Sequence, residues 1–532
     1  MPPFSSELPY PSARQPVMAR NVVATSQPLA AQAGLRMLER GGNAVDAALA
    51  TAIALTVVEP TGNGIGADAF AILWDGEGLH GLNASGRSPS GLTAERFAGQ
   101  ERMPMRSWDA VTVPGAVSAW VALSERFGAL PFEALFEPAI AYAEHGFPVS
   151  PLIARGWRTA ETVFAEHADF VAAFLPDGKA PQPGDTWRFP DQARTLATIA
   201  ETKGEAFYRG ALAEAMVADA RKHGAALTMD DLANHRADWV GTISTGFHGV
   251  ELHEIPPNGQ GLAALLALGI LRHHPLAHAP RDSADFAHLQ IEAMKLAFAD
   301  AHRYVADPCA MDVSVDALLD DGYLAERARL IDPERAGDPG HGEPKHGGTV
   351  YLSAADASGC MVSYIQSNYY GFGSGVVVPG TGISMQNRGA GFVLDEGHPN
   401  RVGPWKRPYH TIIPGFLTQG GAPLASFGVM GGPMQPQGHL QMTVRMTLFG
   451  QNPQAASDAP RWQVLSGRNV SFEPGWSPDV LDDLRSRGHE VKRTTPEESF
   501  AFGGAQIVRR LESGEGYVAG SDHRKDGHAV GF

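Results

Sequence analysis

Residues 346–367, HGGTVYLSAADASGCMVSYIQS, contain the sharpest change of pattern in the chain. From Thr349 onward, apolar side chains alternate with smaller or polar ones. This alternation is interrupted by a turn over 357–359 and begins again at Cys360. This period of two predicts a β-hairpin, because successive side chains of a strand point to opposite faces of a sheet. The first strand follows two glycines directly, so Thr349 comes straight after a flexible backbone.

The segment before this hairpin, residues 331–348, has the composition of an exposed linker. It contains three prolines, five glycines and several charged residues, with one large aliphatic side chain. Because proline and glycine interrupt helices and strands, we expect no packed element there. The linker divides the chain into a part spanning 1–348 and a part spanning 349–532.

Upstream of the linker, the apolar pattern is mostly helical. Pro28 opens one helix, and Asn43 is placed to cap a second helix that runs to about Val58. A hairpin is predicted to turn at 75–78, and helical patterns dominate residues 131–330. Helices followed by a sheet predict an α/β sandwich.

Downstream of the hairpin, strands are predicted over 411–417 and 424–432. The second of these runs through Gly431 and Gly432 into a helix over 436–449. Backbone N–H groups at such a strand-to-helix junction can stabilise a developing oxyanion, because no side chain blocks them. Locally, a tight turn explains the two glycines nearly as well.

Composition excludes several classes of function. The formal charge of -16 and pI near 5.6 argue against binding to nucleic acid or an anionic membrane, which require a basic face. Two cysteines are too few for a disulfide framework, and the first twenty residues lack the apolar core of a secretory signal, so we expect a cytoplasmic protein. No HExxH motif, paired cysteine motif or complete dinucleotide fingerprint is present, so we expect neither a metal nor an organic cofactor.

Thr349 is the candidate nucleophile. No GxSxG elbow appears in a convincing context, whereas a hydroxyl placed after two glycines can attack the peptide bond between Gly348 and Thr349. Cleavage would free an α-amine with a pKa of about 7.7–8, a suitable general base for the threonine hydroxyl. Ser367, on the partner strand, could hydrogen-bond that hydroxyl. A threonine that merely starts a strand remains the alternative.

With these residues in place, the sequence resembles the γ-glutamyltranspeptidase family of N-terminal nucleophile hydrolases over almost its whole length, and it looks closest to the cytosolic glutathione hydrolase-like branch. The resemblance is carried by seven segments: GGNAVDAALATAIALTVVEPTGNGIGADAF (41–70), NASGRSP (83–89), DAVTVPGAVSAW (109–120), HGGTVYLSAAD (346–356), IQSNYYGFGSGVVVPGTGISMQNRGAGF (365–392), KRPYHTIIPGF (406–416) and GVMGGPMQPQGHLQ (428–441).

The resemblance implies a four-layer αββα fold and self-cleavage into a large subunit, 1–348, and a small subunit, 349–532. It also implies roles for single residues. Thr349 matches the nucleophile, Ser367 the supporting hydroxyl, Gly431 and Gly432 the oxyanion hole, and Arg87 the arginine that holds the substrate carboxylate. An arginine suits that task because its guanidinium grips a carboxylate with two parallel bonds.

The sequence departs from the family pattern in the glutamyl pocket. The positions that usually hold an asparagine, an acidic residue and two serines are here Tyr369, Gly391, His410 and Thr411, so the acidic partner of the substrate ammonium is missing.

Two enzymatic readings therefore stay open. The leading one is hydrolysis of γ-glutamyl amides such as glutathione, for which Asp395 or Glu396 could still supply the missing charge. The second is an amidase for carboxylate-ended acyl groups without an α-amino group, of the oxamate amidohydrolase or cephalosporin acylase type. An inactive family member that serves as a scaffold is the alternative of another class. A dimer of heterodimers is possible in either enzymatic case.

Overall fold

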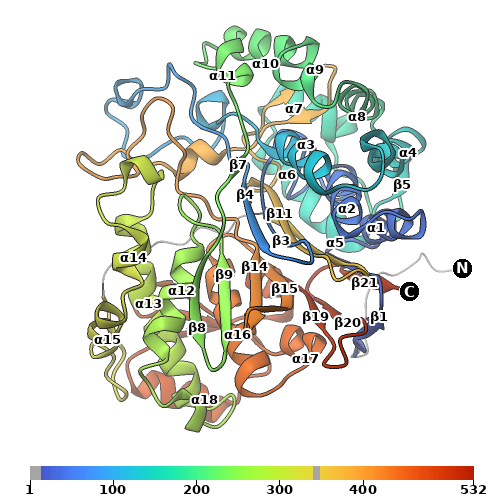
Figure 1. Ribbon diagram of the computed structural model, residues 1–532. Helices are drawn as coiled ribbons and strands as arrows, with labels where there is room; N and C mark the ends of the chain where they lie inside the picture. Colours follow the sequence, from blue (N-terminus) through green and yellow to red (C-terminus); the bar gives the residue numbers. More distant parts are fainter. Residues whose placement is uncertain (1–12, 340–347) are drawn as a thin grey trace, which may run out of the picture.

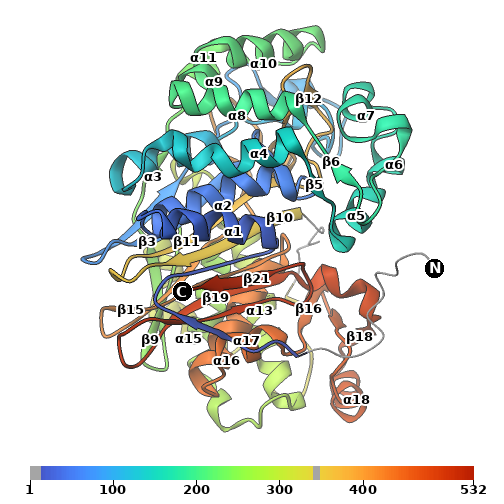
Figure 2. The same cartoon turned by 90° about the vertical axis from the view of Figure 1, so that its right-hand side faces the viewer.

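The computed structural model describes residues 13–339 and 348–532, with only the backbone of Gly348 included. The end of the predicted linker, residues 340–347, lies outside this part of the chain. Two antiparallel sheets form the centre of the described structure, and helices cover the outer face of each (Figures 1 and 2).

Each central sheet contains seven strands. In spatial order, the first sheet comprises β1 (Val17–Ala19), β20 (Tyr517–Ser521), β19 (Gly504–Arg510), β15 (Ala422–Met430), β14 (Gly415–Gln419), β9 (Val250–Glu254) and β8 (Ile243–Phe247). The second comprises β21 (His528–Gly531), β2 (Val22–Thr25), β10 (Gly348–Ala355), β11 (Met361–Tyr369), β3 (Asp68–Trp74), β4 (Leu79–Asn83) and β7 (Asp238–Trp239). Both sheets mix strands from the two sides of residue 348, so the two predicted subunits share one core.

Helices complete the outer layers. Against the second sheet pack α1 (Pro28–Glu39) and α2 (Ala44–Val58), and beyond them lie α3 (Ala116–Phe127), α4 (Glu137–His145), α8 (Pro190–Thr202) and α10 (Ala211–Lys222). Against the first sheet pack α12 (Gly261–Leu271), α16 (Met434–Leu448) and α17 (Pro453–Asp458), and beyond them lie α13 (Ala284–Tyr304) and α18 (Pro478–Ser486). This arrangement is the predicted αββα sandwich.

The helix predicted after Asn43 shows why the sequence folds this way. The Asn43 side chain accepts the amide of Asp46, and the Asp46 carboxylate accepts the amide of Asn43, which forms a capping box. Every residue of α2 is buried, because it lies between the second sheet and the outer helices. None of the helices in the described part of the chain is long and apolar enough to span a membrane.

The structure refines the expected secondary structure. Residues 131–330 are rich in helices, as predicted, and the hairpin of β8 and β9 within this range extends the first sheet. The strand predicted over 411–417 begins only at Gly415, since Pro414 has no amide hydrogen to donate to a ladder.

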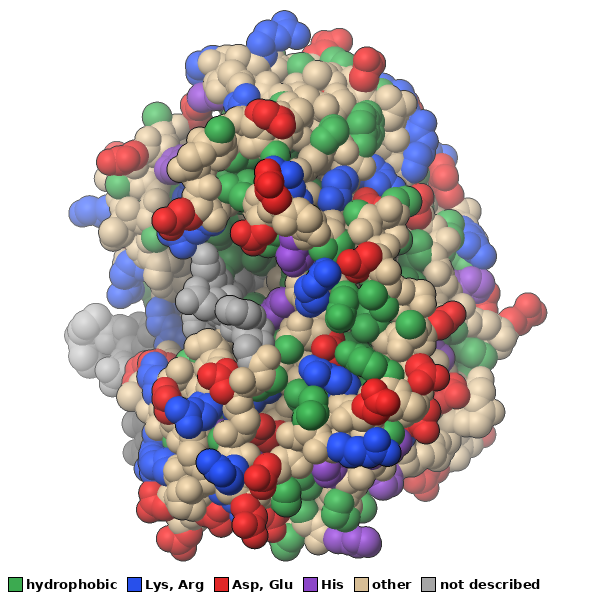
Figure 3. Space-filling model, turned by 90° about the vertical axis from the view of Figure 1, so that its left-hand side faces the viewer, with side chains coloured by type: hydrophobic (Ala, Val, Ile, Leu, Met, Phe, Trp, Pro, Cys, Tyr) green, Lys and Arg blue, Asp and Glu red, His purple; other side chains and the backbone are tan. Residues whose placement is uncertain are grey.

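On the face shown in Figure 3, basic and acidic side chains are interspersed.

Candidate active site

Thr349 lies near the beginning of β10, in the middle of the second sheet (Figure 2). The pairing of β10 with β11 is irregular at this point: Gly348 faces Tyr369, whereas Val350 faces Gln366. Such a bulge interrupts the ladder and can re-aim a side chain. The Thr349 side chain is 5% exposed, in the wall of a cavity of about 470 Å³.

Ser367 is hydrogen-bonded to the candidate nucleophile. Thr349 Oγ1 donates to Ser367 Oγ at 3.2 Å, and the amide of Tyr369 donates to the same Ser367 oxygen at 2.8 Å. Tyr369 has a φ of 78°, which turns its backbone back at the end of β11. On another side, Gln435 Nε2 lies 3.5 Å from Thr349 Oγ1. The hydroxyl is therefore held by groups from two elements.

Gly431 and Gly432 form the turn between β15 and α16. Their φ angles of 125° and 60° fall in the region that favours glycine. The Gly432 carbonyl accepts a hydrogen bond from Gln260 Nε2 at 2.9 Å, which fixes this turn. Gly431 shares the cavity wall with Thr349, as an oxyanion-binding group requires.

Arg87 is placed differently from the other predicted residues. Its Nη1 donates to Asp307 Oδ2 at 2.8 Å and to the Trp405 carbonyl at 3.2 Å. It lines a separate cavity of about 120 Å³ together with Arg407 and does not line the cavity that contains Thr349. Its role in binding a carboxylate stays a prediction.

The remaining predicted positions form a buried network. His410 is fully buried, and its Nε2 lies 3.2 Å from Asp68 Oδ2. Burial, with help from Arg388 and Arg407, holds the pKa of His410 well below its usual range, so the ring is neutral and donates to the carboxylate. The Thr411 hydroxyl accepts a hydrogen bond from Arg388 Nη1 at 2.8 Å.

Sequence reasoning missed two charged residues of this network. Arg388 is 1% exposed, and its guanidinium carbon lies 4.7 Å from the centre of the Tyr369 ring. Asp68 faces Ser367 across β3 and β11, and its Oδ1 accepts the amides of Gly86 and Gly115. Burial raises the pKa of Asp68 to about 7. A charged residue within an apolar strand is the signal that could have revealed Asp68.

Gly391 and the acidic residues Asp395 and Glu396 are not among the residues that line the cavity with Thr349. The Gly391 carbonyl accepts a hydrogen bond from Asn400 Nδ2 at 2.7 Å. Asp395 and Glu396, the acids considered as partners for an ammonium, are exposed, and Glu396 lies 3.6 Å from Arg401. These two carboxylates belong to an exposed turn.

Several titratable groups line the cavity that contains Thr349, and two of them, Glu59 and Lys525, are buried. Burial raises the pKa of Glu59 to about 7 and lowers that of Lys525 to about 7. The segment that carries Lys525 is anchored by Asp522, which pairs with Arg461 at 2.5 Å and with Arg524 at 3.1 Å. Burial alone would raise the pKa of Asp522, but the two guanidiniums outweigh it and hold that pKa well below its usual range.

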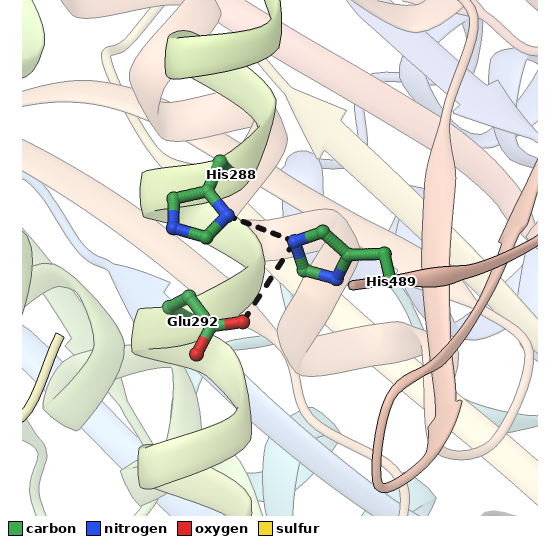
Figure 4. A group of neighbouring side chains, drawn as sticks. All are labelled: His288, Glu292 and His489. Atoms are coloured by element: carbon green, nitrogen blue, oxygen red, sulfur yellow. Dashed lines mark hydrogen bonds and ion pairs between the residues drawn. The ribbon is translucent and has the colours of Figure 1, made fainter. Parts of the chain in front are cut away.

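One cluster has the residue types of a metal site. Figure 4 shows His489 pointing toward His288 and Glu292 of α13, with His288 Nδ1 2.8 Å from His489 Nε2. The donor atoms are already engaged: Glu292 Oε1 accepts from Lys295 Nζ at 2.8 Å, and His288 Nε2 lies 2.8 Å from the Asp332 carbonyl. An ammonium that already binds this carboxylate competes with a metal cation, so the cluster is best described as a buried hydrogen-bond network.

Comparison with known proteins identifies the family. Residues 30–532 match Gamma-glutamyltranspeptidase. The chain belongs to this family. It is 35% identical to the glutathione hydrolase-like YwrD proenzyme of Bacillus subtilis, over 97% of this chain and 100% of that protein. It is 36% identical to the oxamate amidohydrolase proenzyme of Klebsiella pneumoniae, over 95% of this chain and 97% of that protein.

Among solved structures, the cephalosporin acylase from Bacillus halodurans superposes with a TM-score of 0.95 at 50% identity, covering 99% of both chains. The predicted family, the N-terminal nucleophile hydrolase fold and the assignment as an enzyme are thereby confirmed. The relatives named proenzymes support processing of one precursor into two subunits.

Proposed function

We propose that this gamma-glutamyltranspeptidase-family precursor cuts itself between Gly348 and Thr349 and then hydrolyses amides with Thr349 as the nucleophile. One observation carries the proposal: the Thr349 hydroxyl is hydrogen-bonded to Ser367 and lies in the same cavity wall as Gly431. A nucleophile, a supporting hydroxyl and an oxyanion-binding turn thus meet at one place. The subunits 1–348 and 349–532 follow from this cut.

The mechanism uses groups of the chain itself. After the cut, the free amine of Thr349 takes the proton of its own hydroxyl, and Oγ1 attacks the carbonyl carbon of the substrate amide. The amides of Gly431 and Gly432 stabilise the negative oxygen. The C–N bond breaks, the amine leaves with a proton, and water hydrolyses the acyl ester to regenerate Thr349.

For the acyl group, we propose a chain that ends in a carboxylate and has no α-amino group, as in glutaryl or oxamate-like amides. The buried cation Arg388 favours an anionic acyl end. An α-ammonium needs a carboxylate nearby, but Asp68 is already hydrogen-bonded, and Asp395 and Glu396 are exposed. The acidic residue that the family pattern has at position 391 is replaced by glycine, which lowers the affinity for a γ-glutamyl group.

A γ-glutamyl amide, including glutathione, is the second candidate because of Glu59. This carboxylate lines the cavity that contains Thr349, and burial raises its pKa to about 7. An α-ammonium that reached this wall of the cavity would find a counter-charge. Glu59 also accepts a hydrogen bond from Ser26 at 2.5 Å, which occupies one carboxylate oxygen.

A matched pair of substrates tests the proposal. Glutaryl-p-nitroanilide and γ-glutamyl-p-nitroanilide differ only by the α-amino group, so the ratio of their kcat/KM values measures its effect. We expect the processed protein to favour the glutaryl substrate by at least about tenfold, equivalent to about 1.4 kcal/mol. A preference for the γ-glutamyl substrate would replace the first candidate by the second. If Thr349→Ala hydrolysed either substrate at the wild-type rate, the nucleophile would be wrong.

A further inference from the structure

We propose that Arg388 is the side chain that binds the terminal carboxylate of the acyl group, a task that the family resemblance gives to Arg87. This inference rests on the proposed function, because it names the specificity-determining group of the same site. It also predicts which substrates the enzyme prefers, since a buried guanidinium selects an anion over a neutral acyl end.

The guanidinium of Arg388 has one edge unused. Nη1 donates to the Thr411 hydroxyl at 2.8 Å, whereas Nε and Nη2 are buried and without a hydrogen-bond partner. Nε–H and one N–H of Nη2 point in the same direction, so together they form the fork that holds both oxygens of a carboxylate. Buried donors without partners are costly, and this cost is removed when an acceptor of matching shape binds.

The position of Arg388 connects it to the nucleophile. Its guanidinium carbon lies 4.7 Å from the centre of the Tyr369 ring, and the Tyr369 amide donates to Ser367 Oγ. The same Ser367 oxygen accepts the hydroxyl proton of Thr349. One aromatic side chain therefore separates the guanidinium from the group that holds the nucleophile.

The charges around Arg388 also favour an anion. Asp68 is the carboxylate with the largest influence on Arg388, but its Oδ1 accepts two backbone amides and its Oδ2 faces His410. Burial raises the pKa of Asp68 to about 7, so near neutral pH it offsets the positive charge only in part. His410 is neutral, and the second cation nearby, Arg407, pairs with Asp238 at 2.8 Å. A bound carboxylate would balance the part of the Arg388 charge that Asp68 leaves.

Arg87 is less suited to the task in this structure. Its Nη1 is paired with the buried carboxylate of Asp307, and the side chain is 35% exposed. A substrate carboxylate there would compete with Asp307 for the guanidinium. Arg388 has no carboxylate partner of this kind within the described residues.

The test compares two substrates on the processed enzyme. In pentanoyl-p-nitroanilide, a methyl group replaces the carboxylate of glutaryl-p-nitroanilide, so the ratio of the two kcat/KM values reports on carboxylate binding. We expect Arg388→Met to lower the glutaryl-to-pentanoyl ratio by about 10- to 100-fold, the usual effect of losing hydrogen bonds to a charged group. Arg388→Lys keeps the charge without the fork and should lie between. Arg445→Met, which also removes a buried arginine, is the matched control and should keep the wild-type ratio.

Binding of glutarate keeps the inference falsifiable even if a variant is unstable or turnover is slow. Calorimetry should detect glutarate binding to the processed wild type and to Arg388→Lys with reduced affinity. If the wild type hydrolyses amides but does not bind glutarate, the inference is wrong and the proposed function stands. If Arg87→Met lowers the substrate ratio and Arg388→Met does not, Arg87 is the carboxylate-binding residue. If the wild type binds glutarate but hydrolyses no amide, the proposed function fails instead.

Discussion

Replacing Ser367 by alanine should slow self-cleavage while the protein stays folded. Among the interactions that the change removes are the hydrogen bond from Thr349 Oγ1 at 3.2 Å and that from the Tyr369 amide at 2.8 Å. A hydrogen bond between uncharged groups contributes about 0.5–1.5 kcal/mol, so its loss at the nucleophile corresponds to about 2- to 13-fold slower cleavage. The unpaired amide lowers the free energy of unfolding by about 1–3 kcal/mol in addition.

The assay follows conversion of freshly purified precursor by intact-mass spectrometry, with thermal unfolding measured in parallel. Ser363→Ala is the matched control, because Ser363 lies on the same strand and its hydroxyl pairs with Tyr351 at 2.7 Å, away from Thr349. We expect both variants to be destabilised and only Ser367→Ala to cleave slowly. Equal cleavage rates for Ser367→Ala and the wild type would refute the supporting role of Ser367. If both variants cleave equally slowly, the slower cleavage results from the loss of stability and not from the loss of the Ser367 hydroxyl.

Three further predictions concern other parts of the site and fold. Gly431→Ala should abolish most amidase activity, because alanine disfavours a φ of 125° and the turn would move; activity within twofold of wild type would exclude Gly431 from the oxyanion hole. The low pKa of Asp522 stabilises the folded protein at pH values above the ordinary aspartate pKa, about 3.9, and this stabilisation is lost as the pH falls below that value. In urea unfolding measured from pH 7 to pH 3, the free energy of unfolding should therefore fall more steeply for the wild type than for Asp522→Asn. Glu292→Leu removes the carboxylate that pairs with the buried ammonium of Lys295 and should cost about 3–5 kcal/mol, whereas the double variant with Lys295→Met should recover much of that loss in a double-mutant cycle.

Much of the fold follows from local patterns. The capping residue Asn43 and the apolar run behind it predict α2, and the alternation on either side of 357–359 predicts the β10–β11 hairpin. The hairpin of β8 and β9 was missed because its strands are short and each contains polar residues at several positions. Its place at a sheet edge depends on pairing with β14, whose sequence lies more than 150 residues away.

The residues proposed for the site could likewise be predicted only where a local pattern marks them. Thr349, Ser367 and Gly431 carry local signals, namely a strand after glycines, a strand hydroxyl and a strand-to-helix turn. The pairing of Arg87 with Asp307 depends on residues that are 220 positions apart. No local pattern marks that contact or the unused edge of the Arg388 guanidinium, because both arise only when distant segments pack together.

The most direct test of the central claim is the N-terminal sequence and intact mass of the fragments formed by the purified precursor. We predict two fragments, the smaller of which begins at Thr349, and no cleavage in the Thr349→Ala variant under the same conditions. A wild-type chain that stays at 56.5 kDa on prolonged incubation, or a cut at another position, would contradict the assignment of Thr349 as the nucleophile.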